Sequence, residues 1–235
     1  MIRPRRDAVD SLSSRPPLRL KYVEAVLSIG FALSFIAWTR LSAPGPLAPN
    51  TDPSSSGGPF GLDLLLPAPA AYPRSAAGQL AEAFAILTHP LIVLAVTATW
   101  VVYAYTGRMR RLSVSLAIAA TGIPVQFLIA LHLARPTPGA AFADSIAAFA
   151  HAYPNAHVTA MTLASWVLVT LARAHHRSTM VATGTVLGYA AVVMTAVSQW
   201  YMGLATLSDL IGGFLLGAAF ANLALRVGGI DAILT

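Results

Sequence analysis

The sequence predicts an all-α polytopic membrane protein, a bundle of six transmembrane helices with both termini in the cytoplasm. Of its 235 residues, 56% are hydrophobic and only 10% are charged, whereas about a quarter of the residues in soluble domains are charged. Apolar runs recur along the chain, and several approach the roughly 20 residues that an α-helix needs to cross the hydrocarbon core of a bilayer. A water-soluble surface needs more charged residues than this chain has, and we therefore expect the protein to insert into a membrane.

The first 79 residues predict a tail, one span and a loop. Residues 1–20 are rich in arginine and have too little apolar surface to fold alone, which indicates a flexible cytoplasmic tail. Residues 21–79 contain the first span, Tyr22–Trp38, and an outer loop rich in Pro, Gly and Ser with a short apolar insert, LDLLL at 62–66. The long basic lead-in favours an uncleaved anchor, although LSA at 41–43 resembles a cleavage site.

Residues 80–226 predict a membrane core of five further spans, and a short tail follows at 227–235. Basic stretches separate some of these spans: GRMRR at 107–111 follows the second and RAHHR at 173–177 follows the short fourth. The predicted boundaries are Leu80–Tyr105, Ser113–Ala134, Val158–Ala172, Met180–Trp200 and Leu210–Leu225.

The distribution of basic residues predicts the orientation, because Lys and Arg near span ends are retained in the cytoplasm. With the N-terminus inside, twelve basic residues lie on the cytoplasmic side, and only Arg40, Arg74 and Arg135 lie on the outer side. The net charge of +6 is therefore a topology signal, and we expect no nucleic-acid partner. The alanine-rich composition, with arginine preferred over lysine, suits a bacterial inner membrane.

The sequence contains no cysteine, which excludes disulfides, thiolate metal sites and a cysteine nucleophile. We expect neither a metal site nor a cofactor.

Three titratable residues are predicted to meet at the outer face. Arg135 lies in LARP at 133–136, His157 in YPNAHV at 153–158, and Asp209 in SQWYMGLATLSDLIGG at 198–213. Ionisable side chains at membrane depth are energetically expensive, so those that persist there are candidates for function.

These three segments resemble the motifs of the type 2 phosphatidic acid phosphatases. That family carries Lys, six residues, Arg-Pro; then Pro-Ser-Gly-His; then Ser-Arg, five residues, His, three residues, Asp. Seventeen residues separate Pro136 from Pro154, and forty separate His157 from Ser198, which suits the family. The resemblance covers about residues 80–225.

The resemblance implies a mechanism and a substrate class. In the family, the third-motif histidine attacks phosphorus, the aspartate orients its ring, and the second-motif histidine protonates the leaving alkoxide, while cations hold the phosphoryl oxygens. Phosphoryl transfer depends mainly on such positioning and charge stabilisation. The implied partners are a phospholipid or other lipid phosphate, such as a polyprenyl phosphate, and the membrane itself.

The match is incomplete at the residues that carry the chemistry. Arg135, His157 and Asp209 occupy motif positions, His157 and Asp209 as catalytic candidates and Arg135 as a phosphate ligand. Three further residues at motif positions are candidates for phosphate binding. Ser198 matches the family residue, whereas Asn155 stands in place of a serine and Gln199 in place of an arginine. The lysine position is Leu128, the second arginine position is Gln199, and the nucleophile position is Ala205. A methyl group cannot attack phosphorus, so the covalent route of the family is closed at Ala205.

Each candidate also has a structural interpretation. Arg135 can extend its charge to lipid headgroups at a helix end, His157 can cap or pack a helix, and Asp209 can cap the sixth span. His132 and His151 are candidates for a displaced nucleophile, and Glu82 for an ion-pair partner of Arg135 or His157. His89-Pro90 predicts a kink in the second span.

Three functional hypotheses follow. The first is a degenerate member of the family that binds a lipid phosphate with weak or no phosphatase activity, or that acts as a partner subunit of another membrane protein. The second is an active phosphatase or phosphotransferase that uses a displaced nucleophile or an activated water. A transporter or channel is the least favoured, because no span shows paired interior charges or matching broken helices.

Overall fold

The computed structural model describes residues 18–42, 63, 66, 73–135, 137, 142, 144–149, 151–174 and 178–228. Every regular element among these residues is an α-helix, which confirms the all-α prediction. Most of the predicted N-terminal tail and outer loop, and residues 175–177 and 229–235, lie outside the described residues.

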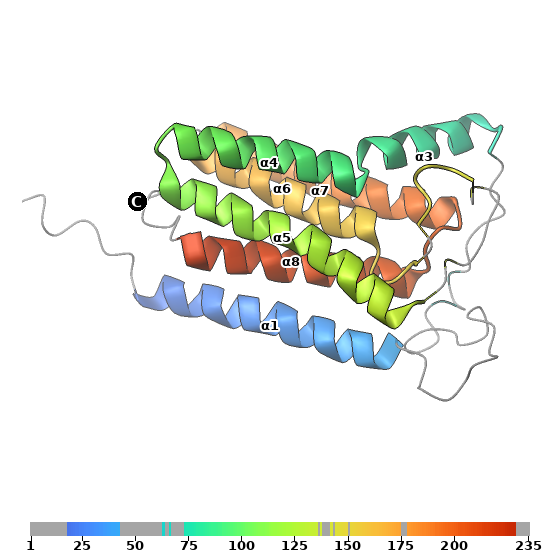
Figure 1. Ribbon diagram of the computed structural model, residues 1–235, viewed down its shortest axis with the longest axis horizontal. Helices are drawn as coiled ribbons and strands as arrows, with labels where there is room; N and C mark the ends of the chain where they lie inside the picture. The colour runs from blue at the N-terminus through green and yellow to red at the C-terminus, as the bar shows by residue number, and fades with distance from the viewer. Residues whose placement is uncertain are drawn as a thin grey trace, which may run out of the picture.

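Among the described residues of the first half of the chain there are four helices, drawn from blue to green in Figure 1. Helix α1 begins four residues before the predicted span and ends four residues after it. The second predicted span is divided into α3 and α4 at Thr88–Pro90. The helices are α1 (Leu18–Ser42), α3 (Ala76–Leu87), α4 (Pro90–Thr106) and α5 (Arg110–Leu133).

The division between α3 and α4 has a local cause. Pro90 is the first residue of α4, a position where its missing N–H removes no helical hydrogen bond. His89 precedes it as the N-cap, and its Nδ1 accepts a hydrogen bond from the Leu91 N–H at 3.3 Å. The kink that His89-Pro90 predicts is therefore a complete helix break.

The second half of the chain forms three long helices that follow the predicted spans closely. These are α6 (Ala156–Ala174), α7 (Ser178–Tyr201) and α8 (Leu207–Gly228). Each begins two or three residues before its predicted start.

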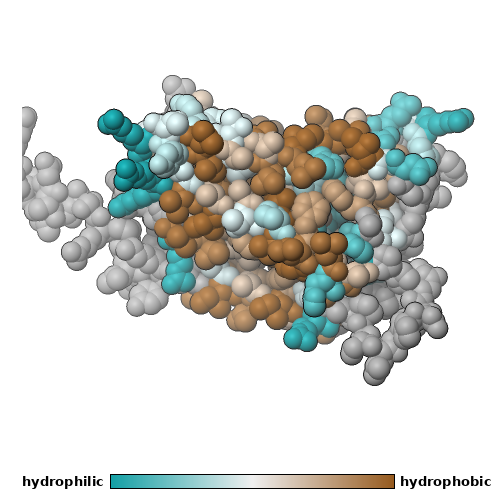
Figure 2. All heavy atoms as spheres, in the orientation of Figure 1, coloured by the Kyte–Doolittle hydropathy of each residue, from teal (hydrophilic) through white to brown (hydrophobic). Residues whose placement is uncertain are grey.

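The bundle has the character of a multi-pass membrane protein. Four segments are long and apolar enough to cross a bilayer: Ala76–Thr106, Arg110–Leu133, Thr179–Tyr201 and Leu207–Val227. Val26–Ser42 and Ala156–Ala172 are shorter apolar helices. The side of the bundle in Figure 2 is largely hydrophobic, with hydrophilic residues gathered toward its two ends. Six crossings stay a prediction.

Helix α8 lies at the centre of the packing, in contact with α1, α5 and α6, while α6 also packs along α7. Small residues allow this closeness: Ala119, Ala160, Ala221 and Ala224 are buried in the central cluster. A Cβ at Gly217 would lie 2.7 Å from the Cβ of Thr162. Helices in membranes associate through such close contacts of small residues.

Polar side chains inside the bundle find backbone partners on neighbouring helices. Ser115 donates to the Ala224 carbonyl, and Ser165 donates to the Gly188 carbonyl at 2.9 Å. Gln126 reaches from α5 to the Pro154 carbonyl at 2.7 Å. These hydrogen bonds pair polar groups for which lipid offers no partner. The two serine bonds join helices to each other, and the Gln126 bond joins α5 to the loop before α6.

Candidate functional site

The three motif segments meet at one end of the bundle. The end of α5, the start of α6, the end of α7 and the start of α8 all lie toward the α3 end in Figure 1. Asn155, at the start of α6, donates its backbone N–H to the Asp209 carbonyl at 3.1 Å, which joins the second and third segments directly. The convergence rests on the packing of α6 against α8.

Arg135 is buried directly after α5. Ala134 ends the helix in a left-handed conformation with φ 48°, and the Arg135 carbonyl accepts a hydrogen bond from the Ala152 N–H at 3.0 Å. The arginine is only 6% exposed. Its Nη1 donates to Ser208 Oγ at 2.9 Å and lies 3.2 Å from Asp209 Oδ1, so the side chain extends into the protein and not toward lipid headgroups.

The second partner of Arg135 is Asp63, which sequence analysis did not identify. Its Oδ2 accepts from Arg135 Nη2 at 3.0 Å and from the Ser208 hydroxyl at 2.7 Å. Its Oδ1 accepts from the Ser208 backbone N–H at 2.8 Å. One carboxylate therefore occupies a guanidinium, a hydroxyl and a backbone N–H at a helix start, the combination that binds anions in proteins.

Asp209 caps α8. Its Oδ2 accepts from both the backbone N–H and the hydroxyl of Thr206, each at 2.8 Å. Thr206 immediately precedes the helix, so the bond from its N–H to the carboxylate is one half of a capping box, while the Asp209 N–H donates to the Thr206 backbone carbonyl at 3.1 Å. Asp209 is fully buried, and its other oxygen faces Arg135. The carboxylate thus holds both the helix start and the arginine.

Asn155 and Gln199 interact with each other. Asn155 Oδ1 accepts from the Val158 N–H at 3.0 Å, which caps α6, and its Nδ2 donates to Gln199 Oε1 at 3.4 Å. Gln199 is 2% exposed, and its Nε2 has no hydrogen-bond partner among the described residues. A buried amide N–H₂ without a partner is an available donor for an anion.

Ser198 is occupied elsewhere: its hydroxyl donates to the Ala81 carbonyl on α3 at 2.7 Å. This bond fastens α7 to α3.

His157 belongs to a separate aromatic cluster. Its Nε2 lies 3.0 Å from the Ala147 carbonyl, and its ring packs against Phe149 and His89 at centroid distances of 5.4 and 5.6 Å. The residue is fully buried, and its Nδ1 has no hydrogen bond to any described residue. Neither Arg135 nor Asp209 is among its described hydrogen-bond partners.

The residue that the motif resemblance assigns to the nucleophile position has apolar surroundings. Ala205 is fully buried in a cluster with Val158, Val192 and Leu210. The methyl group therefore serves packing at this position. No group of three or more His, Asp or Glu among the described residues is arranged to hold a metal ion.

The secondary candidates differ in where they lie. His151 is half-buried and precedes Ala152, whose N–H donates to the Arg135 carbonyl, and its Nδ1 has no hydrogen-bond partner among the described residues. His132 is exposed on α5 beside an apolar groove, although helical spacing places it on the face of Arg135. The left-handed turn at Ala134 ends the helix between the two residues and accounts for the difference. The proposed pairing of Glu82 with Arg135 is wrong, because the ion-pair partners of the arginine are Asp63 and Asp209.

Comparison with known proteins supports the fold. The chain is similar to the crystal structure of the first transmembrane PAP2-type phosphatidylglycerolphosphate phosphatase from Bacillus subtilis, with a TM-score of 0.57. Sequence identity is 17%, over 88% of this chain and 96% of that chain. No family model and no curated protein matches the sequence. The fold is PAP2-like. PAP2 denotes the type 2 phosphatidic acid phosphatases, so the fold implied by the motif resemblance is confirmed.

Proposed function

We propose that the chain is a PAP2-like membrane protein that binds the phosphate group of a lipid and hydrolyses it weakly or not at all. The observation that carries the proposal is the set of donors around Asp63. Arg135 and Ser208 hold its carboxylate by three hydrogen bonds of 2.7 to 3.0 Å. A phosphate monoester presents oxygens and negative charge to the same donors, and arginine with a helix N-terminus is a common phosphate site.

Binding therefore requires the lipid phosphate to displace Asp63. Asp209 remains with Arg135 in that exchange, because it is fixed by Thr206 as the cap of α8. Gln199, with its unpartnered Nε2, and Asn155 are the neighbouring amides in the proposed site. The net exchange replaces one anion by another, so no buried positive charge is left unpaired.

Weak or absent catalysis follows from three features. Ala205 supplies no nucleophile, and its neighbours are apolar. Gln199 is neutral where the family has an arginine. His157, the proposed proton donor to the leaving group, hydrogen-bonds to the Ala147 carbonyl. The displaced-nucleophile hypothesis is less well supported: His132 faces the groove between α1 and α5, and no hydrogen bond joins His151 to the side chain of Arg135 or Asp209 among the described residues.

The direct test is turnover by purified protein in vesicles or detergent. We expect no phosphate release above background from phosphatidic acid, phosphatidylglycerol phosphate or a polyprenyl phosphate. Short-chain phosphatidic acid should nevertheless raise the thermal unfolding midpoint, Tm, whereas the matching diacylglycerol, which lacks the phosphate, should not. Turnover at ordinary enzymatic rates that is lost in His157→Ala would overturn the proposed inactivity, and equal stabilisation by diacylglycerol would overturn the phosphate site.

The proposal includes an orientation: both termini are cytoplasmic and the Arg135 cluster faces outward, in a bacterial inner membrane. Reporter fusions at Arg108 should give a cytoplasmic signal, and fusions at Asp144 an external one. A cytoplasmic signal at Asp144 would place the phosphate site on the wrong side for an outer-leaflet lipid. A membrane-protein partner stays a prediction.

A further inference from the structure

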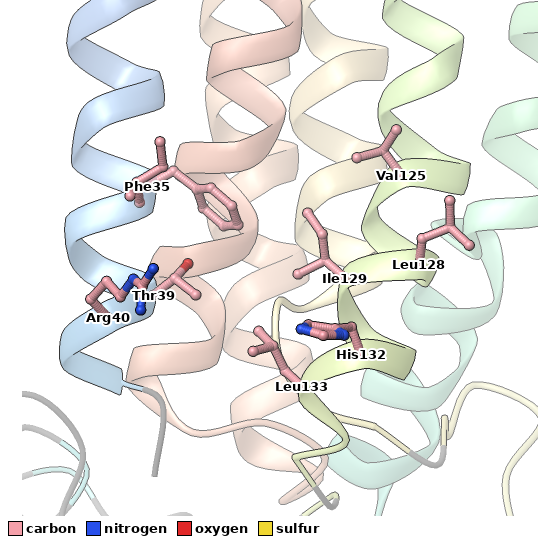
Figure 3. Close-up of a pocket in the computed structure, with 9 residues that line it drawn as sticks. Phe35, Thr39, Arg40, Val125, Leu128, Ile129, His132 and Leu133 are labelled. Carbon is pink, nitrogen blue, oxygen red and sulfur yellow. The ribbon is translucent and has the colours of Figure 1, made fainter. Parts of the chain in front are cut away.

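A groove separates α1 from α5 on the membrane-facing side of the bundle. Both helices pack against α8, but they have few contacts with each other. The groove between them has a volume of about 350 Å³, within the range of pockets that hold small molecules. Figure 3 shows α1 and α5 on its two sides, with side chains from each pointing into the space between them.

The lining of the groove is almost entirely apolar, and its few polar residues lie at one end. Phe35 and Val125 lie in its upper part in Figure 3, and Ile129 continues the apolar wall on α5, while Leu128 lines the outer rim and points away from α1. The polar residues gather at the other end, where both helices terminate, namely Thr39, Arg40 and His132. The groove thus has the polarity of a lipid, with an apolar length and a cationic end.

The polar end of the groove carries an arginine that pairs with no acidic residue among those the structure describes. Arg40 lies in the last turn of α1 and is exposed, and it forms no ion pair with an acidic residue in the part of the chain that the structure describes. The apolar wall is open as well, since Leu128 is 65% and Ile36 is 54% exposed. An arginine and an exposed histidine beside an apolar channel suit a phosphate group joined to a hydrocarbon chain.

We propose that this groove binds an anionic phospholipid from the leaflet at this end of the bundle, the outer leaflet in the proposed topology. One acyl chain lies along Val125, Leu128 and Ile129, and the phosphate contacts Arg40 and His132. The site is distinct from the Arg135 cluster and does not depend on it, because Arg40 and His132 are exposed whereas Arg135 is buried.

The same end of α1 contacts the loops that carry the motif residues. Trp38 Nε1 donates to the Ser208 carbonyl at 3.0 Å, and the hydroxyls of Thr39 and Tyr153 are 2.7 Å apart. A lipid that fills the groove therefore holds α1 in the position where it supports Ser208, and its binding should stabilise the folded protein.

The first test maps the lipid on the unmodified protein. The full chain is reconstituted with phosphatidylglycerol that carries a photoreactive diazirine on one acyl chain, irradiated, and digested for mass spectrometry. We expect cross-links concentrated on α1 and α5 around Phe35 and Ile129, and a several-fold weaker yield with the phosphatidylcholine analogue. Cross-links spread evenly over the lipid-facing helices would overturn the proposal.

The second test measures retained lipid with variants. Arg40→Gln should lower phosphatidylglycerol retention about tenfold, as expected for a charge-assisted hydrogen bond to phosphate, and Leu128→Trp should lower it by crowding the outer rim of the groove. Arg74→Gln, which removes an exposed arginine before α3, is the matched control and should retain the lipid. Equal losses from Arg74→Gln and Arg40→Gln, or displacement of the lipid by millimolar inorganic phosphate, would contradict a lipid site. All three positions are exposed, so the variants should fold, and helical content by circular dichroism in delipidated protein checks this independently of bound lipid, which itself raises Tm.

Discussion

The Asp63 carboxylate lies 3.0 Å from the guanidinium of Arg135, although the two residues are 72 positions apart in the sequence. The side chains of both are largely buried, at 9% and 7% exposed. In the proposed site, Asp63 occupies the donors that a phosphate needs. The chain would therefore carry an internal competitor for its own ligand.

Replacing Asp63 with Asn should make the site more receptive to phosphate. The amide keeps the shape of the side chain but removes the competing charge, so we expect the affinity for short-chain phosphatidic acid to rise at least about tenfold, equivalent to roughly 1.4 kcal/mol. The ligand-free protein should lose about 1–3 kcal/mol of unfolding free energy, because Asp209 is then the one ion-pair partner that Arg135 keeps among the described residues. Isothermal titration and thermal unfolding in detergent measure both effects.

Asp144→Asn is the matched control, because it removes the same charge from an exposed position at the same end of the bundle. It should change neither the affinity for phosphatidic acid nor the unfolding free energy. Unchanged phosphatidic acid affinity in Asp63→Asn would show that Asp63 and the ligand do not share donors.

The close approach of α8 to the start of α6 should be sensitive to a single methyl group. A Cβ at Gly213 would lie 2.5 Å from the backbone oxygen of Asn155, and backbone cannot give way as a flexible side chain can. Gly213→Ala should therefore destabilise the protein by about 1–3 kcal/mol, the usual penalty for overpacking. Gly30→Ala in α1 is the control, since nothing lies within 4 Å of its new Cβ. Equal unfolding midpoints for the two variants would contradict this packing.

The loop residue Tyr153 should make stability depend on high pH. Burial raises the pKa of its phenol to about 12, from an ordinary value of 10. The folded-state pKa exceeds the unfolded value, so the contribution of the protonated phenol is complete below pH 10 and is lost as the pH rises to about 12. Unfolding midpoints measured between pH 9 and 12 should fall more steeply for the wild type than for Tyr153→Phe. Tyr105→Phe, at an exposed position, should retain the wild-type slope.

Much of the fold follows from features that are local in the sequence. Apolar runs predict the long helices to within a few residues, and Pro90 predicts the break between α3 and α4, because proline lacks the N–H that a continuous helix requires. The meeting of Arg135 with Asp209 was expected from motif spacing, and the two residues form an ion pair.

The parts that sequence analysis missed depend on tertiary contacts. Asp63 is a single acidic residue in the short apolar segment LDLLL, and this unusual position is its only sequence indication of a role. Nothing in the neighbouring sequence indicates its hydrogen bond to Ser208. A helix continued through Ala134 would place His132 and Arg135 on the same face. The left-handed conformation of Ala134 ends the helix before Arg135, and no periodic sequence pattern indicates that conformation. Burial of His157 with Phe149 and His89 likewise depends on loops that carry no helical period.

The last prediction concerns restoring catalysis. Ala205→His alone should give no lipid-phosphate hydrolysis above background, for two reasons. The ring must replace a methyl group in the apolar cluster with Val158 and Leu210, which should cost about 1–3 kcal/mol of stability. The developing charge on phosphorus would also lack two of the three family cations, and each missing transition-state contact lowers the rate about 10²- to 10³-fold.

The informative variant combines Leu128→Lys, Gln199→Arg and Ala205→His with Asp63→Asn. It supplies the nucleophile and the two missing family cations, and it removes the competing carboxylate. Because such catalytic parts act as a unit, partial combinations should give rates near background. Lysine at 128 starts from a lipid-facing position beside the groove, so its charge is tolerated only if the side chain reaches inward to the phosphate held by Arg135. We expect measurable phosphate release from phosphatidic acid that disappears when His157→Ala is added. Ordinary enzymatic rates from Ala205→His alone would show instead that neither the missing cations nor the Asp63 ion pair limits the chemistry, and that the nucleophile is the single part this scaffold lacks.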